Sequence, residues 1–500
     1  MDSELKEILK GIKGFRDFYP EDYAEIKKIL DIMHEVSRQF GYEEYEGPSV
    51  EFAKLIEHKS GQALIDETYR LFDRENRKLV LRPEQTPTLA RLVANQHQRY
   101  PKPMRWYCIP RIFRDETPQR GRVKEHFQYN ADIIGIDHVA ADAEIITLTT
   151  QIIKIAGLKD DEFICKINSR ELVQSFIDHL GIKNYLEVIR VIDSREKYLQ
   201  EYIRKELISK GVKKEKADDL SLLFRTVWIQ DSNLTGLGKK LLEDSLTEPY
   251  VKRINEIAES VIKEALGNTG LDTYQTDQLY SFASIKATPF EFVERMKKEI
   301  DLGDKAHDAL NKMLELANYL EINGILQNCI YDASIARGLE YYTGIVYEFF
   351  DRTGSVVRTI AGGGRYDQLV ESFGGGLIPA TGIGMGETVL LSILQQKGRL
   401  GKYKHPAKIY VAPISKDVIK ESAEIANLLR EKYETIFNPF DWNLKKQLQD
   451  AGARDIPLMV VVGKRDLAEN KVTIQDLRTG EKKVINLSKL LDEINKQFKE

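Results

Sequence analysis

Residues 111–135 read RIFRDETPQRGRVKEHFQYNADIIG. A charged cluster and a polar loop lead into a run in which polar and apolar side chains alternate. Successive side chains of a β-strand point to opposite faces, so this run predicts a strand with one polar face. That face would consist of His126, Gln128, Asn130 and Asp132. Alternation alone is also typical of a surface strand, but an imidazole, two amides and a carboxylate beside several arginines would suit a small zwitterion next to an anion.

The length, composition, net charge and cysteine content limit the classes of protein to which this chain can belong. A length of 500 residues predicts about three domains, and 42% hydrophobic residues are enough for a substantial core. The net charge of -4 gives no chain-wide basic surface, so a nucleic-acid partner would need a local basic patch. The 3 cysteines are far apart and no CxxC spacing occurs, which argues against a disulfide framework and a zinc site.

The beginning of the chain shows no signal or transit peptide, and no apolar run approaches the roughly 20 residues that span a bilayer. We therefore expect a soluble, cytoplasmic protein that does not enter a membrane.

The first 162 residues are predicted to form strands joined by loops, with flanking helices and an antiparallel sheet. A helix is expected to begin at Pro20 and to stop near Gly41, because apolar residues recur there at spacings of three and four. Another helix is expected to pass through Leu89 and Val93. The remaining predictions are strands at 42–50, 78–81 and 104–109, a hairpin of 104–109 with 111–135, and a helix at 141–157.

Helical patterns dominate residues 163–326, which we interpret as a mostly helical insertion. Strand-like segments return at 344–350 and 356–360 and are followed by glycine-rich turns. After the break at 398–405, strands and helices alternate, which predicts a small α/β domain with a mostly parallel sheet. Its strands are expected at 409–412, 434–437, 458–462 and 471–474, and its helices at 419–432 and 444–452.

The common nucleotide-binding signatures are missing, because the sequence has neither a GxxxxGK[ST] loop nor a GxGxxG opening a helix after a strand. A nucleotide site would have to be built from side chains on a sheet. Arginine suits that role, since its planar fork binds phosphate and carboxylate with two hydrogen bonds. Arg114, Arg122 and Arg337 are the candidates; each alone would more often be a surface residue, so the argument depends on their order along the chain.

The ordered motifs resemble those of class II aminoacyl-tRNA synthetases, and of the histidyl-tRNA synthetase family in particular. Residues 45–50 are similar to the first class II motif, a dimer-interface strand, and RIFRDE followed by GRVKEHFQ is similar to the second. The segments RGLEYY at 337–342 and AGGGRYD at 361–367 resemble histidyl signatures, as does LKKQLQDAGAR at 444–454. The likeness runs from Gly14 to about residue 485 and is weakest in the insertion.

This resemblance implies an α+β fold: a class II synthetase catalytic domain with an antiparallel sheet and a helical insert, plus a C-terminal α/β anticodon-binding domain. The catalytic domain would comprise residues 1–162, with motifs 1 and 2, and 327–398, with the histidine motif and the motif 3 region. The helical insertion would occupy 163–326, and the anticodon-binding domain 405–500. A homodimer is also implied.

The implied activity is the ATP-dependent attachment of L-histidine to its tRNA through a histidyl-adenylate, with ATP and Mg²⁺ required. Arg114 and Arg337 would be the catalytic residues and would hold the α-phosphate from two sides. The ATP site would contain Arg114, Glu116, Arg122, His126 and Phe127. Glu116 and Asp132 remain open alternatives as residues near the Mg²⁺.

The resemblance also implies a histidine site. Glu84 and Thr86 would hold the ammonium group of the substrate, and Gln128 would contact its backbone end. Asp132 and Tyr342 would bind the two imidazole nitrogens. The complete set is Glu84, Thr86, Gln128, Asp132, Arg337, Tyr341, Tyr342 and Tyr366. For the tRNA, Lys445, Lys446 and Arg454 are the expected phosphate contacts.

The sequence departs from the family pattern at three places. The third motif usually carries an arginine for the γ-phosphate, but residues 381–394 contain none. Either Arg122 or Arg120 takes that phosphate, or this branch binds ATP differently. His126 stands where an adenine-stacking phenylalanine is usual, with Phe127 displaced to the other strand face. The pocket carboxylate is Asp132, which is shorter than the usual glutamate.

Two other functions compete with this interpretation. A synthetase-like regulatory subunit that senses histidine and controls histidine biosynthesis would explain the missing arginine, but the RGLEYY segment and the C-terminal domain argue against it. A class II synthetase for another amino acid would leave the tyrosine-rich histidyl motif unexplained.

Overall fold

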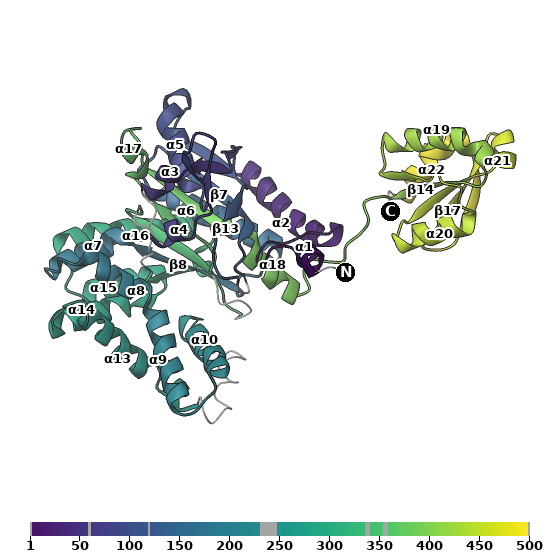
Figure 1. Cartoon of the computed structure of the whole chain (residues 1–500). Coiled ribbons are helices and arrows are strands. Elements are labelled where there is room, and N and C mark those ends of the chain that lie inside the picture. The colour runs from purple at the N-terminus through teal and green to yellow at the C-terminus, as the bar shows by residue number, and fades with distance from the viewer. Residues whose placement is uncertain are drawn as a thin grey trace. The chain divides into compact units, whose positions relative to one another are not determined.

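The computed structural model describes residues 3–58, 62–118, 121–230, 248–335, 341–353 and 359–498. The chain divides into two compact units, Met1–Leu400 and Gly401–Glu500 (Figure 1). The break lies within the predicted linker at 398–405. The finer division of the first unit at residues 162 and 326 stays a prediction.

The first unit is organised around a large sheet, which is 10-stranded within the described residues. Its strands follow the order β1-β5-β7-β13-β12-β11-β8-β10-β9, and β6 pairs with β7. Most neighbours are antiparallel, with β1/β5 and β10/β8 parallel, so the predicted antiparallel catalytic sheet is confirmed. The strands are β1 (Glu43–Glu44), β5 (Met104–Cys108), β6 (Arg111–Phe113), β7 (Glu125–Ile134), β8 (Phe163–Ser169), β9 (Lys286–Ala287), β10 (Cys329–Asp332), β11 (Ile345–Asp351), β12 (Thr359–Arg365) and β13 (Ala380–Gly386).

The predicted hairpin forms, because β5 and β6 both pair antiparallel with β7. On one face of β7, Tyr129, Ala131 and Ile133 are buried in the main hydrophobic core. The helices α2 (Pro20–Gln39), α6 (Val139–Ala156) and α18 (Glu387–Gln396) cover this face and contact one another or the sheet. The opposite face of β7 is left for the polar side chains.

Helix α2 shows why the sequence folds this way. Its apolar residues Ile26, Ile29, Met33 and Val36 fall on one side and are buried, as their spacing of three and four predicts. Pro20 opens the helix, where a missing N–H costs nothing, and Gly41 follows its end at φ +77°.

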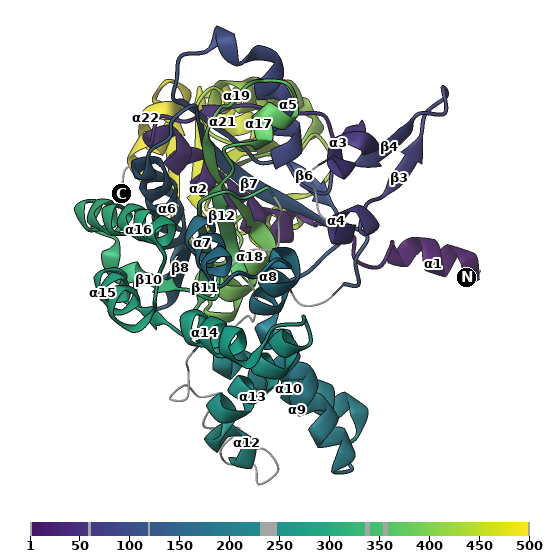
Figure 2. The same ribbon diagram turned by 90° about the vertical axis from the view of Figure 1, so that its left-hand side faces the viewer.

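The insertion consists mainly of helices, which lie together around the end of the large sheet that carries β11, β8 and β10 (Figure 2). Its described helices are α7 (Arg170–His179), α8 (Tyr185–Asp193), α9 (Arg195–Ser209), α10 (Lys214–Gln230), α12 (Glu248–Lys252), α13 (Ile254–Gly267), α14 (Thr273–Ala283), α15 (Pro289–Glu299) and α16 (Asp304–Ile322). The sequence does not show that β8, at the start of this region, is a strand of the large sheet. Polar and apolar residues alternate only at 165–168, and all seven residues of the strand are buried, so no exposed polar face marks it.

A separate three-stranded sheet has the order β2-β4-β3, with β2 (Val50–Phe52), β3 (Arg70–Phe72) and β4 (Lys78–Leu81). We expected one strand over 42–50, whereas the structure has β1 and β2 on different sheets, with Pro48 between them. Proline cannot donate to a strand ladder, which explains the interruption. The remaining helices of this unit are α1 (Ser3–Lys10), α3 (Ala53–Glu57), α4 (Gln62–Asp66), α5 (Thr86–Gln96) and α17 (Leu369–Ser372).

The second unit is a five-stranded sheet with helices, in the order β15-β14-β16-β17-β18. We predicted a mostly parallel sheet, but β14 pairs in parallel with β15 and β16, whereas β16/β17 and β17/β18 are antiparallel. The last strand was missed because its residues KKVIN begin with two lysines and are mostly exposed, so they give no clear apolar face. The elements are β14 (Ile409–Pro413), β15 (Thr435–Phe437), β16 (Leu458–Val462), β17 (Lys471–Asp476), β18 (Lys482–Asn486), α19 (Ile419–Arg430), α20 (Leu444–Ala453), α21 (Lys464–Ala468) and α22 (Leu490–Gln497).

Among the described helices, none has the length and apolar character needed to cross a bilayer.

Candidate active site

A cavity of about 1290 Å³ opens on the polar face of β7. Such a volume exceeds the ~300–1,000 Å³ that usually holds one small ligand, so it has room for two substrates side by side. Its lining includes most of the predicted site residues that the structure describes: Glu84, Thr86, Arg114, Glu116, Arg122, His126, Gln128, Asp132, Tyr341, Tyr342 and Tyr366. The fold therefore brings together side chains from positions 84 to 366.

The neighbouring strand β13 makes the space that the polar side chains occupy. Gly382 pairs with Asp132, Gly384 with Asn130 and Gly386 with Gln128. All three glycines line the cavity, so β13 presents bare backbone where other residues would fill the pocket. A Cβ on Gly382 would overlap Oδ1 of Asp132, whereas one on Gly384 would lie 3.2 Å from Nε2 of Gln128.

This difference yields a prediction for two matched variants. We expect Gly382→Ala to displace Asp132 and to lower the activity that the resemblance implies, measured as histidine-dependent ATP–pyrophosphate exchange, by at least about 100-fold, since misplacement of a binding group by about 1 Å costs on that order. Gly384→Ala needs only a small shift of Gln128 and should lose less than about tenfold, because a shift of a few tenths of an ångström leaves that side chain close to its position. Exchange rates of both variants measure this; equal losses would contradict the proposed role of the Gly382 space.

At one end of the cavity, basic and acidic side chains meet around the loop between β6 and β7. Nε of Arg114 donates to the carbonyl of Pro83 at 2.9 Å, which fixes its guanidinium beside the segment that carries Glu84. Arg122 forms ion pairs with Glu116 and with Glu67, the latter at 2.9 Å. Arg120 lies outside the described residues.

His126 lines this end of the cavity, but Phe127 does not. The Phe127 ring lies on the other face of β7, where the guanidinium of Arg111 stacks at 4.5 Å from its centroid. Burial, Arg114 and Arg16 together lower the pKa of His126 to about 3. The imidazole is therefore neutral at physiological pH and can stack on a flat ring without adding charge.

At the other end, two carboxylates meet two tyrosines. The hydroxyl of Tyr366 donates to Oδ1 of Asp132 at 2.5 Å, and the hydroxyl of Tyr341 donates to Oε2 of Glu84 at 3.2 Å. Tyr341 also packs against Tyr342 with ring centroids 4.8 Å apart. Burial raises the pKa of Asp132 to about 7, and the hydrogen bond from Tyr366 opposes part of that rise.

Of the other predicted residues, Thr86 begins α5 and Gln128 donates to Oδ1 of Asn130 at 2.8 Å. Arg337 lies outside the described residues. The predicted tRNA contacts Lys445, Lys446 and Arg454 are exposed in the second unit, on α20 or directly after it.

Sequence reasoning missed Arg16 and Glu387. They form an ion pair between a turn near the N-terminus and the first residue of α18, and Arg16 also approaches the carbonyl of Glu125 at 3.5 Å. Glu387 is completely buried. The two residues are 371 positions apart, so no local pattern could have connected them.

Comparison with known proteins agrees with this geometry. A family model described as histidyl-tRNA synthetase matches residues 14–258 and 236–388, and one described as an anticodon binding domain matches 408–497. The chain belongs to the histidyl-tRNA synthetase family. The match covers the large sheet and every described residue of the predicted ATP and histidine sites.

Curated relatives extend the likeness over nearly the whole chain. The histidine–tRNA ligase of Pyrococcus horikoshii is 33% identical over 493 residues, which are 98% of this chain and 100% of that protein. The chloroplastic/mitochondrial histidine–tRNA ligase of Arabidopsis thaliana is 31% identical and covers 96% of this chain and 85% of that protein.

Solved structures support the fold. The histidyl-tRNA synthetase of Nostoc sp. PCC 7120 superposes with a TM-score of 0.72 at 22% identity and covers 98% of this chain and 99% of its own. A protein described as an ATP phosphoribosyltransferase regulatory subunit/histidyl-tRNA synthetase from Bacillus halodurans gives 0.63 at 22% identity, over 87% and 95% of the two chains. The class II synthetase fold predicted for this chain is confirmed.

Proposed function

We propose that this chain activates L-histidine with ATP and transfers the histidyl group to its tRNA. Membership of the histidyl-tRNA synthetase family supports this function. The observation that carries it is the polar face of β7, which holds a carboxylate–tyrosine pair at one end of a cavity and arginines at the other. One end suits histidine, and the other suits the phosphates of ATP.

The first step joins two anions, a histidine carboxylate and the α-phosphate of ATP. Its barrier comes from charge repulsion and from the alignment of the reacting atoms, so positioned cations supply most of the catalysis and no general base is needed. Arg114 would bind the α-phosphate from the side of the β6–β7 loop. Arg337 would bind it from the opposite side.

The histidine end can recognise both charge and shape. Glu84, with Tyr341 donating to it, would accept hydrogen bonds from the substrate ammonium group. Asp132 would accept from one imidazole nitrogen through Oδ2 while Tyr366 occupies Oδ1. Tyr342 would bind the other nitrogen. A substrate without these nitrogens would leave buried polar groups unpaired, which is strongly unfavourable.

Magnesium fits this site with few protein ligands. Within the described residues, no group of three or more His, Cys, Asp or Glu side chains could hold a metal ion. Mg²⁺ commonly binds phosphates and one or two carboxylates while keeping several waters. Glu116 suits this role better than Asp132, whose raised pKa and hydrogen bond from Tyr366 keep it at the histidine end. The ion would neutralise charge on the phosphates.

The γ-phosphate needs a cation that α18 does not provide, since its residues 387–396 contain no arginine. Arg122 would serve, released from Glu67 or Glu116 when ATP binds. Arg16 adds a second positive charge near His126, and its pairing with Glu387 keeps that buried carboxylate from repelling the phosphates.

The second unit would bind the tRNA anticodon, as the anticodon binding domain match supports. We expect Lys445→Ala combined with Lys446→Ala to raise KM for the histidine tRNA about tenfold, because each lost phosphate contact weakens binding and reduces its salt dependence. Exchange without tRNA should be unchanged. The control is Lys482→Ala, which removes an exposed lysine of β18. If this control raised KM for the tRNA as much as the double variant does, the effect would come from overall charge.

A homodimer would cover exposed apolar residues of the small sheet. Phe52 and Phe72 are 53% and 66% exposed, and Val50 and Leu71 lie on the same strands β2 and β3. Exposed apolar patches of this kind often mark interfaces.

We also expect the enzyme to work in the cytoplasm, which fractionation of cells would test.

The decisive test is ATP–pyrophosphate exchange with each of the twenty amino acids, followed by charging of the histidine tRNA. Exchange with histidine alone, and charging of that tRNA, are expected. Histidine binding without exchange would favour the regulatory alternative, which the relatives do not support better than the enzyme.

A further inference from the structure

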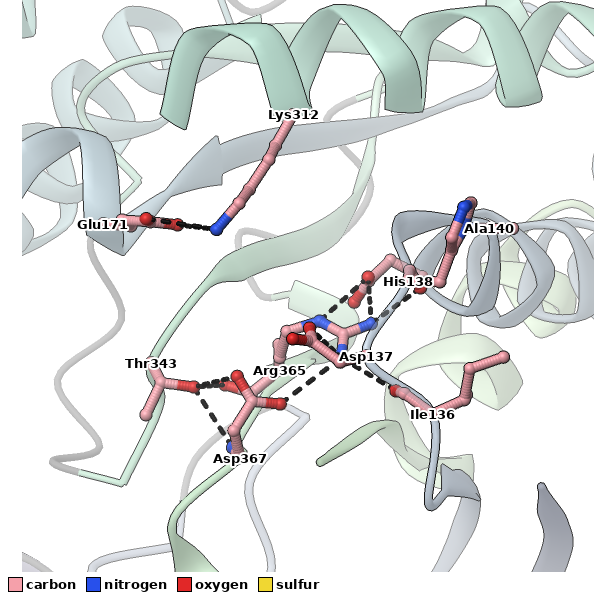
Figure 3. A network of polar contacts seen from close by, with 10 residues as sticks. Ile136, Asp137, His138, Ala140, Glu171, Lys312, Thr343, Arg365 and Asp367 are labelled. Carbon is pink, nitrogen blue, oxygen red and sulfur yellow. Dashed lines mark hydrogen bonds and ion pairs between the residues drawn. The ribbon is translucent and has the colours of Figure 1, made fainter. Parts of the chain in front are cut away.

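Arg365 ends β12 and directly precedes Tyr366, one of the pocket tyrosines. Its side chain does not line the cavity and is only 5% exposed. It lies instead in a network of polar contacts that includes His138, Thr343 and Asp367 (Figure 3). The activity proposed above assigns no role to this arginine.

The guanidinium of Arg365 is held from several directions. Nε and Nη2 donate to Oδ2 of the buried Asp142 at 3.1 and 2.6 Å, a charge-assisted contact to α6. Nη2 also donates to the carbonyl of His138 at 2.9 Å, and Nη1 to that of Ile136 at 3.2 Å. Nη1 reaches Oδ1 of Asp367 at 3.3 Å. The planar fork of arginine can serve these acceptors together, which the single ammonium of lysine cannot.

The network continues to the second tyrosine segment. Thr343, which follows Tyr342, donates from its hydroxyl to Oδ2 of Asp367 at 2.9 Å and accepts from the backbone N–H of Asp367 at 3.1 Å. The N–H of Thr343 donates to the carbonyl of Arg365 at 2.8 Å. Tyr342 and Tyr366 are therefore each one residue away from a member of the network, on segments far apart in the chain.

The loop that supplies the two carbonyls is itself fixed. His138 is the N-cap residue of α6, and its Nδ1 accepts a hydrogen bond from the N–H of Ala140 at 3.1 Å. Its Nε2 lies 3.4 Å from Oε1 of Glu315, and its ring packs edge-on against Tyr319, both on α16. Arg365 is thus connected to α6 and, through His138, to the last helix of the insertion.

We propose that Arg365 is a positioning residue for histidine recognition, which holds the segments of Tyr342 and Tyr366 at the spacing that the pocket needs. The inference rests on the proposed function. Tyr366 must lie so that it donates to Asp132, and Tyr342 so that it reaches the substrate imidazole. Loss of the arginine would leave the buried Asp142 without its charged partner, so both segments would move.

The test compares Arg365→Lys with Arg105→Lys. Arg105 makes a two-point ion pair with Glu144 on the same helix α6, at 2.7 and 2.9 Å, and touches neither tyrosine segment. In exchange assays we expect Arg365→Lys to raise KM for histidine about 10- to 100-fold, a loss typical of groups displaced by about 1 Å, with KM for ATP changed less than about twofold. Arg105→Lys should leave both constants near those of the wild type.

A milder pair keeps the inference testable if Arg365→Lys does not fold. Thr343→Val removes the hydroxyl at nearly constant volume, and Thr343→Ser keeps it. Only Thr343→Val should raise KM for histidine, by at least about fivefold, because the hydroxyl makes two hydrogen bonds with Asp367. Equal rises in both KM values, or a lowered melting temperature with unchanged KM, would overturn the positioning role. Wild-type protein without histidine-dependent exchange would instead refute the proposed function itself.

Discussion

Arg114→Ala is expected to reduce kcat for histidine-dependent exchange by about 10²- to 10³-fold, the usual cost of removing one preorganised group that stabilises transition-state charge. The reason is geometric. Arg114 follows β6, lines the cavity and is fixed by the carbonyl of Pro83, so its guanidinium needs little reorganisation when the α-phosphate develops charge. A residue that only binds ATP would mainly change KM, whereas a loss confined to kcat reports the transition state.

Arg111→Ala is the matched control for this prediction. Arg111 is three residues earlier, but its side chain pairs with Glu125 at 2.5 Å and stacks on Phe127, away from the cavity. Its removal should change the free energy of unfolding by at most about 1 kcal/mol, as is usual for a surface ion pair. Because the side chain lies away from the cavity, kcat should stay within about threefold. If both variants lost kcat equally, the specific role of Arg114 would have to be abandoned. Arg337→Ala should resemble Arg114→Ala.

Sequence reasoning was most successful where periodicity and a buried face coincide. The alternation in residues 125–134 predicted the polar face of β7, and the cavity lies on that face. The catalytic sheet, the hairpin and the helix from Pro20 were predicted for the same reason. Strand β8 was not predicted, because its alternation is limited to residues 165–168 and all of its residues are buried.

The sequence could name many of the residues that line the cavity but not the partners of their side chains. The pairing of Tyr366 with Asp132 joins positions 234 residues apart, and that of Tyr341 with Glu84 joins positions 257 apart. Phe127 shows a different limit. The predicted ATP site included it, although the alternation already placed its ring on the other strand face, where it stacks with Arg111 and does not line the cavity. The glycines of β13 carried no local sign of their purpose, because the side chains that need their space come from another strand.

Asp132→Asn is expected to weaken histidine binding and, at pH 8, to stabilise the folded protein. Asp132 accepts from Tyr366 and would accept from the histidine imidazole, so its loss should raise KM for histidine about 10- to 100-fold, as for hydrogen bonds to a charged group worth roughly 1.5–3 kcal/mol. KM for ATP should change little. Titration of KM against pH would show whether the ionised carboxylate is the form that binds.

Although Asp132→Asn should weaken histidine binding, it should increase the free energy of unfolding above neutral pH. Burial raises the pKa of Asp132 from 3.8 to about 7, so between these values the unfolded chain has released a proton that the folded chain retains. The free energy of unfolding contributed by this group is therefore highest at low pH and is lost as pH rises through about 7. An asparagine side chain does not ionise, so Asp132→Asn should be the more stable form at pH 8, by up to a few kcal/mol at about 1.4 kcal/mol per pKa unit.

Melting temperatures of the wild type and of Asp132→Asn between pH 5 and pH 8 measure this difference. The wild type should lose stability across neutral pH, and the variant should lose less. Tyr366→Phe provides the complementary test, because the hydrogen bond from Tyr366 lowers the pKa of Asp132. Without that hydroxyl the loss should move to higher pH. Parallel curves for all three proteins would show that Asp132 does not titrate in this range. In that case the ionised carboxylate of Asp132 would lie in the pocket without the loss of folding stability that its burial implies.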